Sequence, residues 1–585
     1  MNIIKCDIMN ELFRTPYTSQ RVLSDAVGYS LGKVNQTVTQ LQEEGYLDRQ
    51  YRPTEKAQIE RNEKKPENAI ILAAGFGMRM VPINREIPKG LLEVHGETLI
   101  ERQIRQLQEV GIRDITVVVG FMKEAYEYLI DQYGVKLLVN REYAEKNNLH
   151  SLALAAKKLG NTYIVPCDIR CEKNPFSKDE LYSWYMVTDL VDDESEVRVN
   201  RKLELVEVDE DKSGNTMIGI AYITREDSGW LRSRLLEMDR KKSCAGSFWE
   251  SALMEKGKMK IWARVESSAG VCEINTYEQL REMDKNSKNL ESDVLKLIAQ
   301  ALNCKVEEIT EIEILKKGMT NRSFFFVNGN QRFIMRIPGE GTEQLINRRQ
   351  EHQVYQAVSG LHLSDTIRYF DPENGYKMTE YLPDTHCCDP ENPEEVKKCM
   401  KVLRQFHHSG LKVDHTFRLW ENIEFYESLW NGEPSCYRDY QKTKEKVYEL
   451  KQYVDSQPKN WSLCHIDSVP DNFLIKDKED GEAEIHLIDW EYAGMQDTDV
   501  DIAMFAIYSM YEKEQVDALI DAYYREGCPR EVRIKIYCYV AVCGLLWSNW
   551  CEFKRQQGVE FGEYSLRQYR YAKEYYRYVK AEIEK

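Results

Sequence analysis

The sequence predicts a multidomain protein of the α/β and α+β classes, and three observations along its 585 residues support this. Residues 1–62 read as short amphipathic helices followed by a basic turn. Residues 68–288 alternate short apolar runs with helical stretches, which is typical of a parallel sheet with helices on both faces. Residues 290–585 begin with strand-like segments and become mostly helical, as in a small sheet lobe followed by a helical lobe. A chain of this length needs several cores, so we expect three domains with these boundaries.

Composition places the chain among ordinary globular proteins. Hydrophobic residues make up 42% and charged residues 30%, which excludes a largely disordered chain. The formal net charge of -17 argues against broad contact with nucleic acid or an anionic membrane. The 15 cysteines include no C-x-x-C pair, so we expect reduced thiols rather than disulfides or a zinc site. The N-terminus has no signal-like layout and no apolar run is long enough to span a bilayer, so we expect a cytoplasmic protein without membrane insertion.

The first 62 residues carry the pattern of two packed helices broken between Gly28 and Gly32. The stretch GYLDRQYRPTEKA that follows resembles the wing of a winged helix-turn-helix domain. The resemblance implies a helix beginning near Ser30 that would face a DNA major groove. Residues 1–64 hold nine basic and nine acidic side chains, so the segment is neutral. Two interpretations therefore stay open, DNA binding and a docking or dimerisation module that does not bind DNA.

A glycine-rich loop follows the first apolar strand of the middle domain, in LAAGFGMRM at 72–80. Gly75 and Gly77 let the backbone approach a phosphate closely. Arg79 supplies a cationic fork for phosphate oxygens, and Lys89 in EIPKGLLEV adds a point charge. The sequence therefore predicts a nucleotide site with Arg79 and Lys89 as catalytic residues. The predicted nucleotide-binding residues are Leu72, Ala73, Ala74, Gly75, Gly77, Arg79 and Lys89.

These residues resemble the sugar-phosphate and choline-phosphate nucleotidyltransferases, a Rossmann-like family. Where relatives have Gly-Thr-Arg, residues 77–79 read Gly-Met-Arg, and NNLHSL at 147–152 is most similar to bacterial choline-phosphate cytidylyltransferases. The resemblance implies that Asp168 and Asn275 are magnesium ligands, although several relatives have Asp at the second position. The chemistry needs a cation, because CTP and its phosphorylated acceptor are both anions.

Phosphocholine is the acceptor that this resemblance implies. Its quaternary ammonium has no hydrogen to donate, so only ring faces and carboxylates can recognise it. The run FWE at 248–250 offers both, and Trp249 and Glu250 are the predicted substrate-binding residues of the middle domain. Phosphoethanolamine or a sugar phosphate stays open as the acceptor.

Two motifs in the C-terminal domain are the sharpest signals in the chain, WSLCHIDSVPDNFLI at 461–475 and HLIDWEYAG at 486–494. Asp467 and Asn472 lie on one predicted loop, and Asp489 follows an apolar strand. Kinase-like enzymes need one carboxylate for the substrate hydroxyl, and an amide and a second carboxylate for Mg²⁺ on the ATP phosphates. We therefore expect Asp467 to be catalytic and Asn472 and Asp489 to be metal ligands.

Both motifs, with GMTN and MRIPGEGTEQLINR further upstream, resemble bacterial choline kinases, which have a protein-kinase-like fold of two lobes. The resemblance implies a phosphate-covering turn with Gly318, Thr320 and Asn321. It also implies that Arg336 grips the ATP phosphates and forms an ion pair with Glu351.

Relatives cage the trimethylammonium group with aromatic side chains. The predicted substrate-binding residues of this domain are accordingly Trp490, Trp547 and Trp550. Ile466 stands before the catalytic aspartate, where relatives often have Asn or Gly, and we interpret this replacement as neutral.

Together the resemblances imply a bifunctional enzyme of the lic type. Its C-terminal domain would phosphorylate choline with ATP, and its middle domain would transfer a cytidylyl group from CTP to phosphocholine and release pyrophosphate. Mg²⁺ is the implied cofactor. Two alternatives stay open: the same chemistry on ethanolamine or a sugar phosphate, and a DNA-binding regulator whose enzyme-like domains only sense ligands. A homodimer also stays open.

Overall fold

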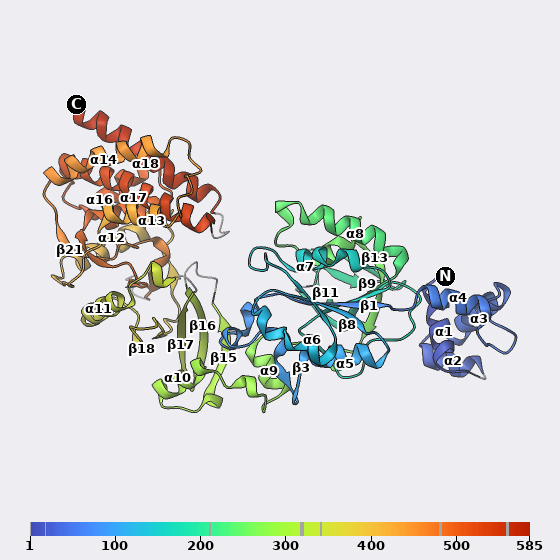
Figure 1. The fold of residues 1–585 in the computed structure, drawn as a ribbon. Coiled ribbons are helices and arrows are strands. Elements are labelled where there is room, and N and C mark those ends of the chain that lie inside the picture. Colours follow the sequence, from blue (N-terminus) through green and yellow to red (C-terminus); the bar gives the residue numbers. More distant parts are fainter. Residues whose placement is uncertain are drawn as a thin grey trace. The chain divides into compact units, whose positions relative to one another are not determined.

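The computed structural model describes residues 2–17, 19–193, 195–209, 212–315, 321–339, 342–478, 483–556 and 561–585. The chain folds into two compact units, whose elements are labelled in Figure 1. Met1–Leu297 and Ile312–Ile314 form the first unit, and Ile298–Glu311 and Leu315–Lys585 form the second. The first unit thus holds both the N-terminal helices and the α/β sheet that the sequence predicts.

The N-terminal domain consists of α1 (Ile3–Arg14), α2 (Gln20–Val27), α3 (Leu31–Glu43) and α4 (Glu55–Glu63). Gly28 ends α2 in the left-handed conformation, with φ at 71°, and Ser30 precedes α3, so the expected break and helix start are confirmed. The expected two-stranded wing is reduced to a single bridge between Leu47 and Pro53. Proline has no N–H to extend a ladder, and α4 begins two residues later.

The N-terminal domain packs directly on the middle domain, at the segment Ser177–Tyr182, which we call the docking segment. Leu181 is fully buried in the same apolar cluster as Ile8 and Leu12 of α1. The Tyr182 hydroxyl donates a hydrogen bond of 2.8 Å to Asp7. The core of the N-terminal domain is therefore completed by residues of the middle domain.

A ten-stranded sheet forms the centre of the first unit, in the order β5-β4-β1-β6-β11-β8-β13-β10-β9, with β12 beside β13. Its parallel half contains β5 (Lys136–Val139), β4 (Asp114–Val119), β1 (Asn68–Ala73) and β6 (Thr162–Pro166). Its other half contains β11 (Gly214–Ile223), β8 (Trp184–Asp192), β13 (Lys258–Glu266), β10 (Glu204–Glu207), β9 (Val197–Val199) and β12 (Met254–Glu255). Because β11 is antiparallel to both β6 and β8, the predicted parallel sheet is confirmed for the first half, whereas the second half is mixed and pairs β8 with β13 in parallel.

Helices cover both faces of this sheet, as expected. Ile70 and Ile71 are successive residues of β1 and belong to two different apolar clusters, because side chains alternate across a strand. The surrounding helices are α5 (Leu99–Glu109), α6 (Tyr128–Tyr133), α7 (Asn148–Leu154), α8 (Arg225–Asp239) and α9 (Tyr277–Met283). Short pairs are formed by β2 (Glu93–Val94) with β3 (Glu97–Thr98) and by β7 (Ile169–Cys171) with β14 (Val271–Glu273). The carboxyl ends of β1 and β6 meet at one edge of the sheet, which is where ligands bind in such folds.

The second unit has the expected small sheet followed by a helical lobe. The sheet has the order β15-β16-β17-β19-β18, with β15 (Ile309–Ile314), β16 (Asn321–Asn328), β17 (Gln331–Pro338), β19 (Lys377–Glu380) and β18 (Ile367–Phe370). The helices are α10 (Asp293–Leu302), α11 (Arg348–Val358), α12 (Pro393–His407), α13 (Leu419–Ser428), α14 (Tyr440–Ser456), α15 (Asp499–Tyr508), α16 (Lys513–Tyr523), α17 (Arg530–Gln556) and α18 (Glu563–Glu584).

Four short strands frame the two motifs of this lobe. The loop with Asp467 connects β21 (Trp461–Cys464) to β22 (Phe473–Asp477). Asp489 lies between β23 (Ala483–Leu487) and β24 (Gly494–Asp497), and β20 (His386–Cys387) pairs with β22. The apolar run at 536–547 is buried in the middle of α17, as expected. Among the described residues no helix is long and apolar enough to cross a membrane.

Candidate active sites

The glycine-rich loop of the first unit lies against Lys89. Gly77 has φ at 60°, in the left-handed region that favours glycine, and a Cβ there would lie 3.7 Å from the Cβ of Lys89. Gly90 is enclosed even more tightly, because a Cβ would meet the Tyr126 hydroxyl at 3.1 Å and the Cβ of Cys167 at 3.2 Å. The Lys-Gly pair therefore lets the chain pass close to the end of β6 and directs Lys89 to the carboxyl edge of the sheet.

Lys89 joins the two predicted metal ligands. Its Nζ lies 2.5 Å from Oδ2 of Asp168 and 2.5 Å from Oδ1 of Asn275. Asp168 follows β6 and Asn275 follows β14, so residues more than a hundred positions apart meet at one point. Burial and the charge of Asp168 raise the pKa of Glu273, which places a second acidic group here. Carboxylate and amide oxygens are the ligands that Mg²⁺ takes in proteins, so this donor set fits a magnesium ion.

The other predicted residues of the loop lie around this point. Leu72 and Ala73 end β1, and Ala74 follows them, all three buried. Gly75 is exposed, and so is Arg79 on the short turn Met78–Met80. The geometry thus presents one loop with a free backbone and two cationic side chains, which suits a nucleoside triphosphate.

Glu250 is a partly buried acid close to this centre, and its Oε2 atom is enclosed. Its Oε1 accepts a hydrogen bond of 3.2 Å from the Tyr185 hydroxyl, and Oε2 has no hydrogen-bond partner in the described part of the chain. A Cβ on Gly219 would lie 3.5 Å from Oε1 and 2.6 Å from Cγ of Pro166, so the carboxyl lies beside the end of β6. Burial raises the pKa of Glu250 to about 7.

Trp249 occupies a different environment from its neighbour. It is fully buried, its ring centroid lies 5.9 Å from that of Tyr185, and its backbone N–H donates to Asn148 at 2.8 Å. The ring is therefore part of the core that supports Glu250. Tyr185 was missed by sequence reasoning, because nothing in the strand WYMV distinguishes a site tyrosine from a core one.

In the second unit the loop with Asp467 is closed by its own asparagine. Nδ2 of Asn472 donates to Oδ2 of Asp467 at 3.1 Å and to its backbone oxygen at 2.8 Å. Burial, together with the charges of Asp489 and Glu491, raises the pKa of Asp467 to about 8. Asp489 has φ at 67° and lies 3.7 Å from Nη1 of Arg336. Asp467, Asn472 and Asp489 thus converge as the motifs indicate.

Arg336 forms the expected ion pair with Glu351. Nη1 lies 2.5 Å from Oε1 and Nη2 lies 3.0 Å from Oε2. Burial alone would raise the pKa of Glu351, but the charges of Arg336 and Lys377 lower it to about 2. Arg348 links Glu351 to Glu491, at 2.9 Å and 3.2 Å. This buried network fixes the guanidinium beside Asp489.

The interpretation of Ile466 as a neutral replacement is wrong. Ile466 has φ at 69°, a conformation that costs a β-branched residue about 1–2 kcal/mol and that Asn and Gly tolerate. Its N–H donates to Oδ1 of Asp501 at 2.7 Å, and the N–H of His465 donates to Oδ2 at 2.8 Å. Asp501 thus holds the backbone in the conformation that presents Asp467.

Aromatic rings form a chain of contacts that begins at the two predicted tryptophans. Trp547 lies 5.8 Å from Trp550, ring centroid to centroid. The rings that extend this chain are Tyr426, Tyr492, Phe561 and Tyr564, with successive centroids 5.3 to 6.4 Å apart. Burial and the charge of Asp467 raise the pKa values of three of these residues, Tyr426, Tyr492 and Tyr564. We call the six rings the aromatic cage, and three of them therefore lie within electrostatic range of the Asp467 carboxylate.

Trp490 does not belong to the aromatic cage. It is fully buried, packs 5.0 Å from Phe406, and donates its indole N–H to Leu487 at 2.9 Å. The structure therefore does not support its predicted contact with substrate, and Tyr492 in the same motif contacts Trp547 of the aromatic cage instead. Gly318 and Thr320 lie outside the described residues, and Asn321 opens β16.

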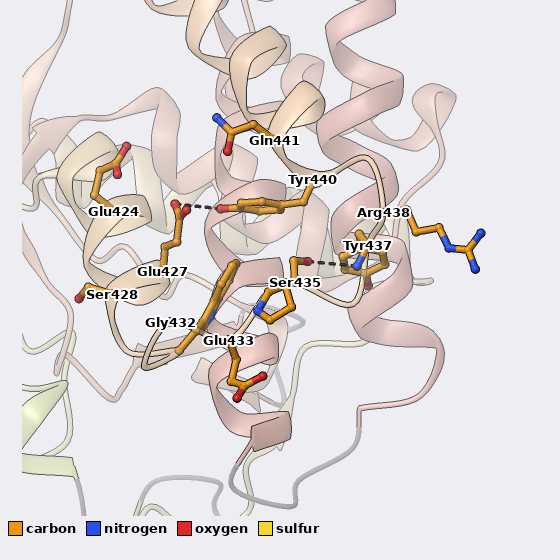
Figure 2. Close-up of a pocket in the computed structure, with 12 residues that line it drawn as sticks. Glu424, Glu427, Ser428, Gly432, Glu433, Ser435, Tyr437, Arg438, Tyr440 and Gln441 are labelled. Atoms are coloured by element: carbon orange, nitrogen blue, oxygen red, sulfur yellow. Dashed lines mark hydrogen bonds between the residues drawn. The ribbon is translucent and has the colours of Figure 1, made fainter.

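A surface cavity of about 710 Å³ in the second unit includes none of these residues in its lining (Figure 2). It lies at the end of α13 and the start of α14, and its lining contains three glutamates. Two of these already have partners, because Lys444 pairs with Glu424 and Glu427, and the Tyr440 hydroxyl donates to Glu427 as Figure 2 shows. The cavity is therefore separate from the candidate active site around Asp467.

The two centres define a bifunctional enzyme that transfers phosphorus-containing groups. Residues 312–564 match the family model of choline/ethanolamine kinases, residues 69–174 match the MobA-like NTP transferase domain, and residues 1–48 match the winged helix-turn-helix DNA-binding domain. The structure of choline kinase LicA from Streptococcus pneumoniae aligns at 28% identity with a TM-score of 0.43, over 49% of this chain and 100% of that one.

Two curated relatives match the middle domain. The choline-phosphate cytidylyltransferase of Streptococcus pneumoniae is 31% identical over 230 residues, which is 38% of this chain and 98% of that protein. The 2-aminoethylphosphonate cytidylyltransferase of Lancefieldella rimae is 45% identical over 105 residues, which is 17% of this chain and 43% of that protein. Through its middle domain the chain belongs to the choline-phosphate cytidylyltransferase family.

Proposed function

We propose that this chain converts choline to CDP-choline in two steps. Residues 290–585 phosphorylate choline with ATP, and residues 68–288 transfer a cytidylyl group from CTP to the phosphocholine formed. The observation that carries the proposal is the aromatic cage beside Asp467. A permanently charged ammonium without hydrogens is bound by ring faces, and each face contributes about 0.5–2 kcal/mol.

In the kinase step, Asp467 accepts the proton of the choline hydroxyl or orients that hydroxyl toward the γ-phosphate. A carboxylate with a pKa near neutrality suits this task, because a base works best when its pKa lies near the working pH. Arg336, held by Glu351, binds phosphate oxygens of ATP. Asn472 and Asp489 would hold Mg²⁺, which supplies positive charge to the phosphates.

In the cytidylyl step, a phosphate oxygen of phosphocholine attacks the α-phosphorus of CTP. The bond to the β-phosphate oxygen breaks, and pyrophosphate leaves. Lys89 and Arg79 stabilise the charge that grows on the phosphate oxygens. Asp168 and Asn275 would hold Mg²⁺, which neutralises the two anions as they approach. The carboxyl of Glu250 faces the ammonium end of the acceptor, with Tyr185 fixing its orientation.

The test is to incubate purified protein with ATP, CTP, Mg²⁺ and one amino alcohol, either choline or ethanolamine, and to follow products by mass. We expect phosphocholine first and CDP-choline second, with ethanolamine converted much less efficiently. If ethanolamine were converted more efficiently than choline, ethanolamine would replace choline as the proposed substrate, and the two proposed reaction types would stand. Protein that leaves both nucleotides unconsumed with choline present would sink the proposal.

The relative that acts on 2-aminoethylphosphonate supplies a useful third substrate. This compound has a phosphonate but no hydroxyl, so it bypasses the kinase step and enters only the cytidylyl step. Offering it with CTP alone, beside phosphocholine with CTP alone, measures the acceptor preference of the middle domain by itself. We expect phosphocholine to have the higher kcat/KM.

A further inference from the structure

The N-terminal domain is bound to the docking segment by charged and polar contacts as well as by its core. Arg61 of α4 makes a two-pronged ion pair with Asp179, at 2.5 Å and 2.7 Å, and the Asp179 side chain is only 2% exposed. Arg14 of α1 donates to the Ser177 hydroxyl at 2.9 Å. Contacts that combine burial with fixed geometry hold two domains in one arrangement, unlike the loose polar contacts of a mobile pair.

This docking uses α1 and α4 and leaves the opposite side of the domain open. On α3 the apolar residues Val34, Val38 and Leu41 are fully buried. Among its polar residues, Lys33, Asn35, Gln36 and Thr39 are exposed, whereas Thr37 is buried. A helix that presents short amide, hydroxyl and cationic side chains in a winged-helix setting fits the major groove of duplex DNA.

The domain is neutral overall, and its exposed charges are of both signs. Arg21 on α2, Lys33 on α3 and Arg49 at the turn after α3 are exposed. The exposed acids Asp25 and Glu43 lie on the same two helices. The three cations can contact phosphates beside the groove, whereas phosphates repel the two acids.

The docking segment is connected to β6, the strand that precedes Asp168, both along the chain and through hydrogen bonds. In the chain it follows Asp168 through β7. In space, the hydroxyl of Tyr163 on β6 donates to Glu180 at 2.9 Å and accepts from the backbone N–H of Ser177 at 3.0 Å. Gln103 stabilises the turn that contains Asp168, because its side-chain amide donates to the backbone oxygens of Pro166 and Ile169, each at 2.8 Å. A continuous path of contacts thus connects the turn that carries Asp168 to the surface on which the N-terminal domain lies.

We propose that the N-terminal domain binds duplex DNA while docked, and that CTP at the cytidylyl centre changes its DNA affinity through the docking segment. The part that concerns CTP rests on the proposed function. By linkage, any factor by which CTP changes DNA affinity must equal the factor by which DNA changes CTP affinity. Such couplings typically amount to about fivefold or more.

The experiment uses the full chain and a pool of random duplexes of about 30 base pairs, long enough for two half-sites. Duplexes retained by the chain are enriched and labelled, and their affinity is measured at one salt concentration with and without saturating CTP and Mg²⁺. We expect a change in Kd of about fivefold or more, and the same factor for CTP affinity when DNA is saturating. ATP in place of CTP should have no such effect.

Two variants separate the parts of the proposal. Lys33→Ala with Gln36→Ala should lose the enriched duplex and keep cytidylyl transfer unchanged. Asp179→Asn weakens the Arg61 contact and should keep DNA binding while reducing the CTP effect. Asp114→Asn is the matched control, because Asp114 forms an exposed ion pair with Lys136 in the same sheet, away from the docking segment.

The inference is overturned if no duplex is enriched above the Lys33→Ala, Gln36→Ala background, or if CTP leaves the Kd within twofold. Cytidylyl transfer to phosphocholine is measured on the same sample. Protein that transfers but shows no effect of CTP on DNA binding contradicts only this inference. Protein that does not transfer contradicts the proposed function instead.

Discussion

The two centres of this chain are proposed to handle one head group, yet they are built from different side chains. In the second unit six aromatic residues form one connected set of ring contacts, and three of them lie near Asp467. In the first unit the candidate group is a single buried carboxyl, Glu250, with a tyrosine attached to it. A ring face attracts a cation at any pH, whereas a carboxyl with a pKa near 7 attracts it only when ionised.

The difference also concerns charge. Around Asp467 several acids face the cations Arg336 and Arg348, so the centre keeps both signs close together. Around Asp168 one lysine contacts a carboxylate and a neutral amide. Glu273 and Glu250 lie near this group, so both centres mix acids with cations. The comparison teaches that the two centres hold their cations differently, two arginines within a buried network of acids in one and a lysine against one carboxylate and one amide in the other.

The largest effect should come from removing one catalytic group at each centre. Asp467→Asn removes the proton acceptor and should lower kcat of choline phosphorylation by about 10²–10⁴-fold, with cytidylyl transfer unchanged. Lys89→Met should lower cytidylyl transfer by about 10²–10³-fold, with the kinase step unchanged. Each step is assayed separately, from choline with ATP and from phosphocholine with CTP. If either variant slowed both steps, the two centres would not be independent.

A second prediction sharpens the contrast between rings and carboxyl. Trp550→Leu removes one ring of the aromatic cage and should raise KM for choline by about tenfold, which corresponds to a loss of about 1.4 kcal/mol. The KM for ethanolamine should change by less, because a primary ammonium relies on hydrogen bonds. Phe553→Leu, one turn further along α17 and equally buried, is the control and should leave the ratio of the two KM values unchanged. An equal rise for both substrates in Trp550→Leu would contradict the assignment.

The pH dependence of the cytidylyl step tests the role of Glu250. A carboxyl whose pKa is raised to about 7 is mostly protonated at pH 6 and mostly ionised at pH 8. KM for phosphocholine should therefore fall as pH rises through 7, by up to about tenfold. Glu250→Gln should remove this fall in KM. Only the pH dependence that comes from the ionisation of CTP and phosphocholine themselves should then be left. Choline phosphorylation should show no corresponding change in KM, since its cage is made of rings.

The smallest expected effect concerns the backbone before Asp467. Ile466→Asn loses a buried apolar side chain but relieves the left-handed conformation, worth about 1–2 kcal/mol. Ile475→Asn is the matched control, because Ile475 is equally buried on β22, where the backbone is extended. The first variant should be less destabilised than the second by about 1–2 kcal/mol, seen as a smaller fall in the midpoint of thermal inactivation of the kinase step. Equal falls would show that the strain at Ile466 is negligible.

The sequence predicts proximity best for residues that lie in a short contiguous motif. Asp467, Asn472 and Asp489 lie close together because their spacing places them on two adjacent loops, and Lys89 reaches Asp168 because it follows the glycine-rich loop closely. The functional roles of these four residues stay predictions. The fold class followed from the alternation of strands and helices. The mixed half of the sheet could not be predicted, because strand direction depends on pairing between distant segments.

The missed residues share a physical reason. Tyr426 and Tyr185 reach their centres only through tertiary packing, and aromatic residues in a sequence are more often core than site. Trp490 shows the reverse error, because the turn after Asp489 directs its ring into the core and Tyr492 toward the cage. Ile466 was misjudged because a residue name does not reveal its φ angle.

The docking segment has a practical consequence for anyone who divides this chain. A cut near residue 65 would appear safe, since the winged-helix and transferase sequences separate there. It would nevertheless leave Asp179 without Arg61, and would bare Leu181 and Tyr182 to solvent. The shortened transferase would then expose an apolar patch prone to aggregation, with the unpaired Asp179 in it. The separated N-terminal helices would lack part of their hydrophobic core. Poor solubility of either fragment would therefore result from the position of the cut and would say nothing about the stability of the intact enzyme.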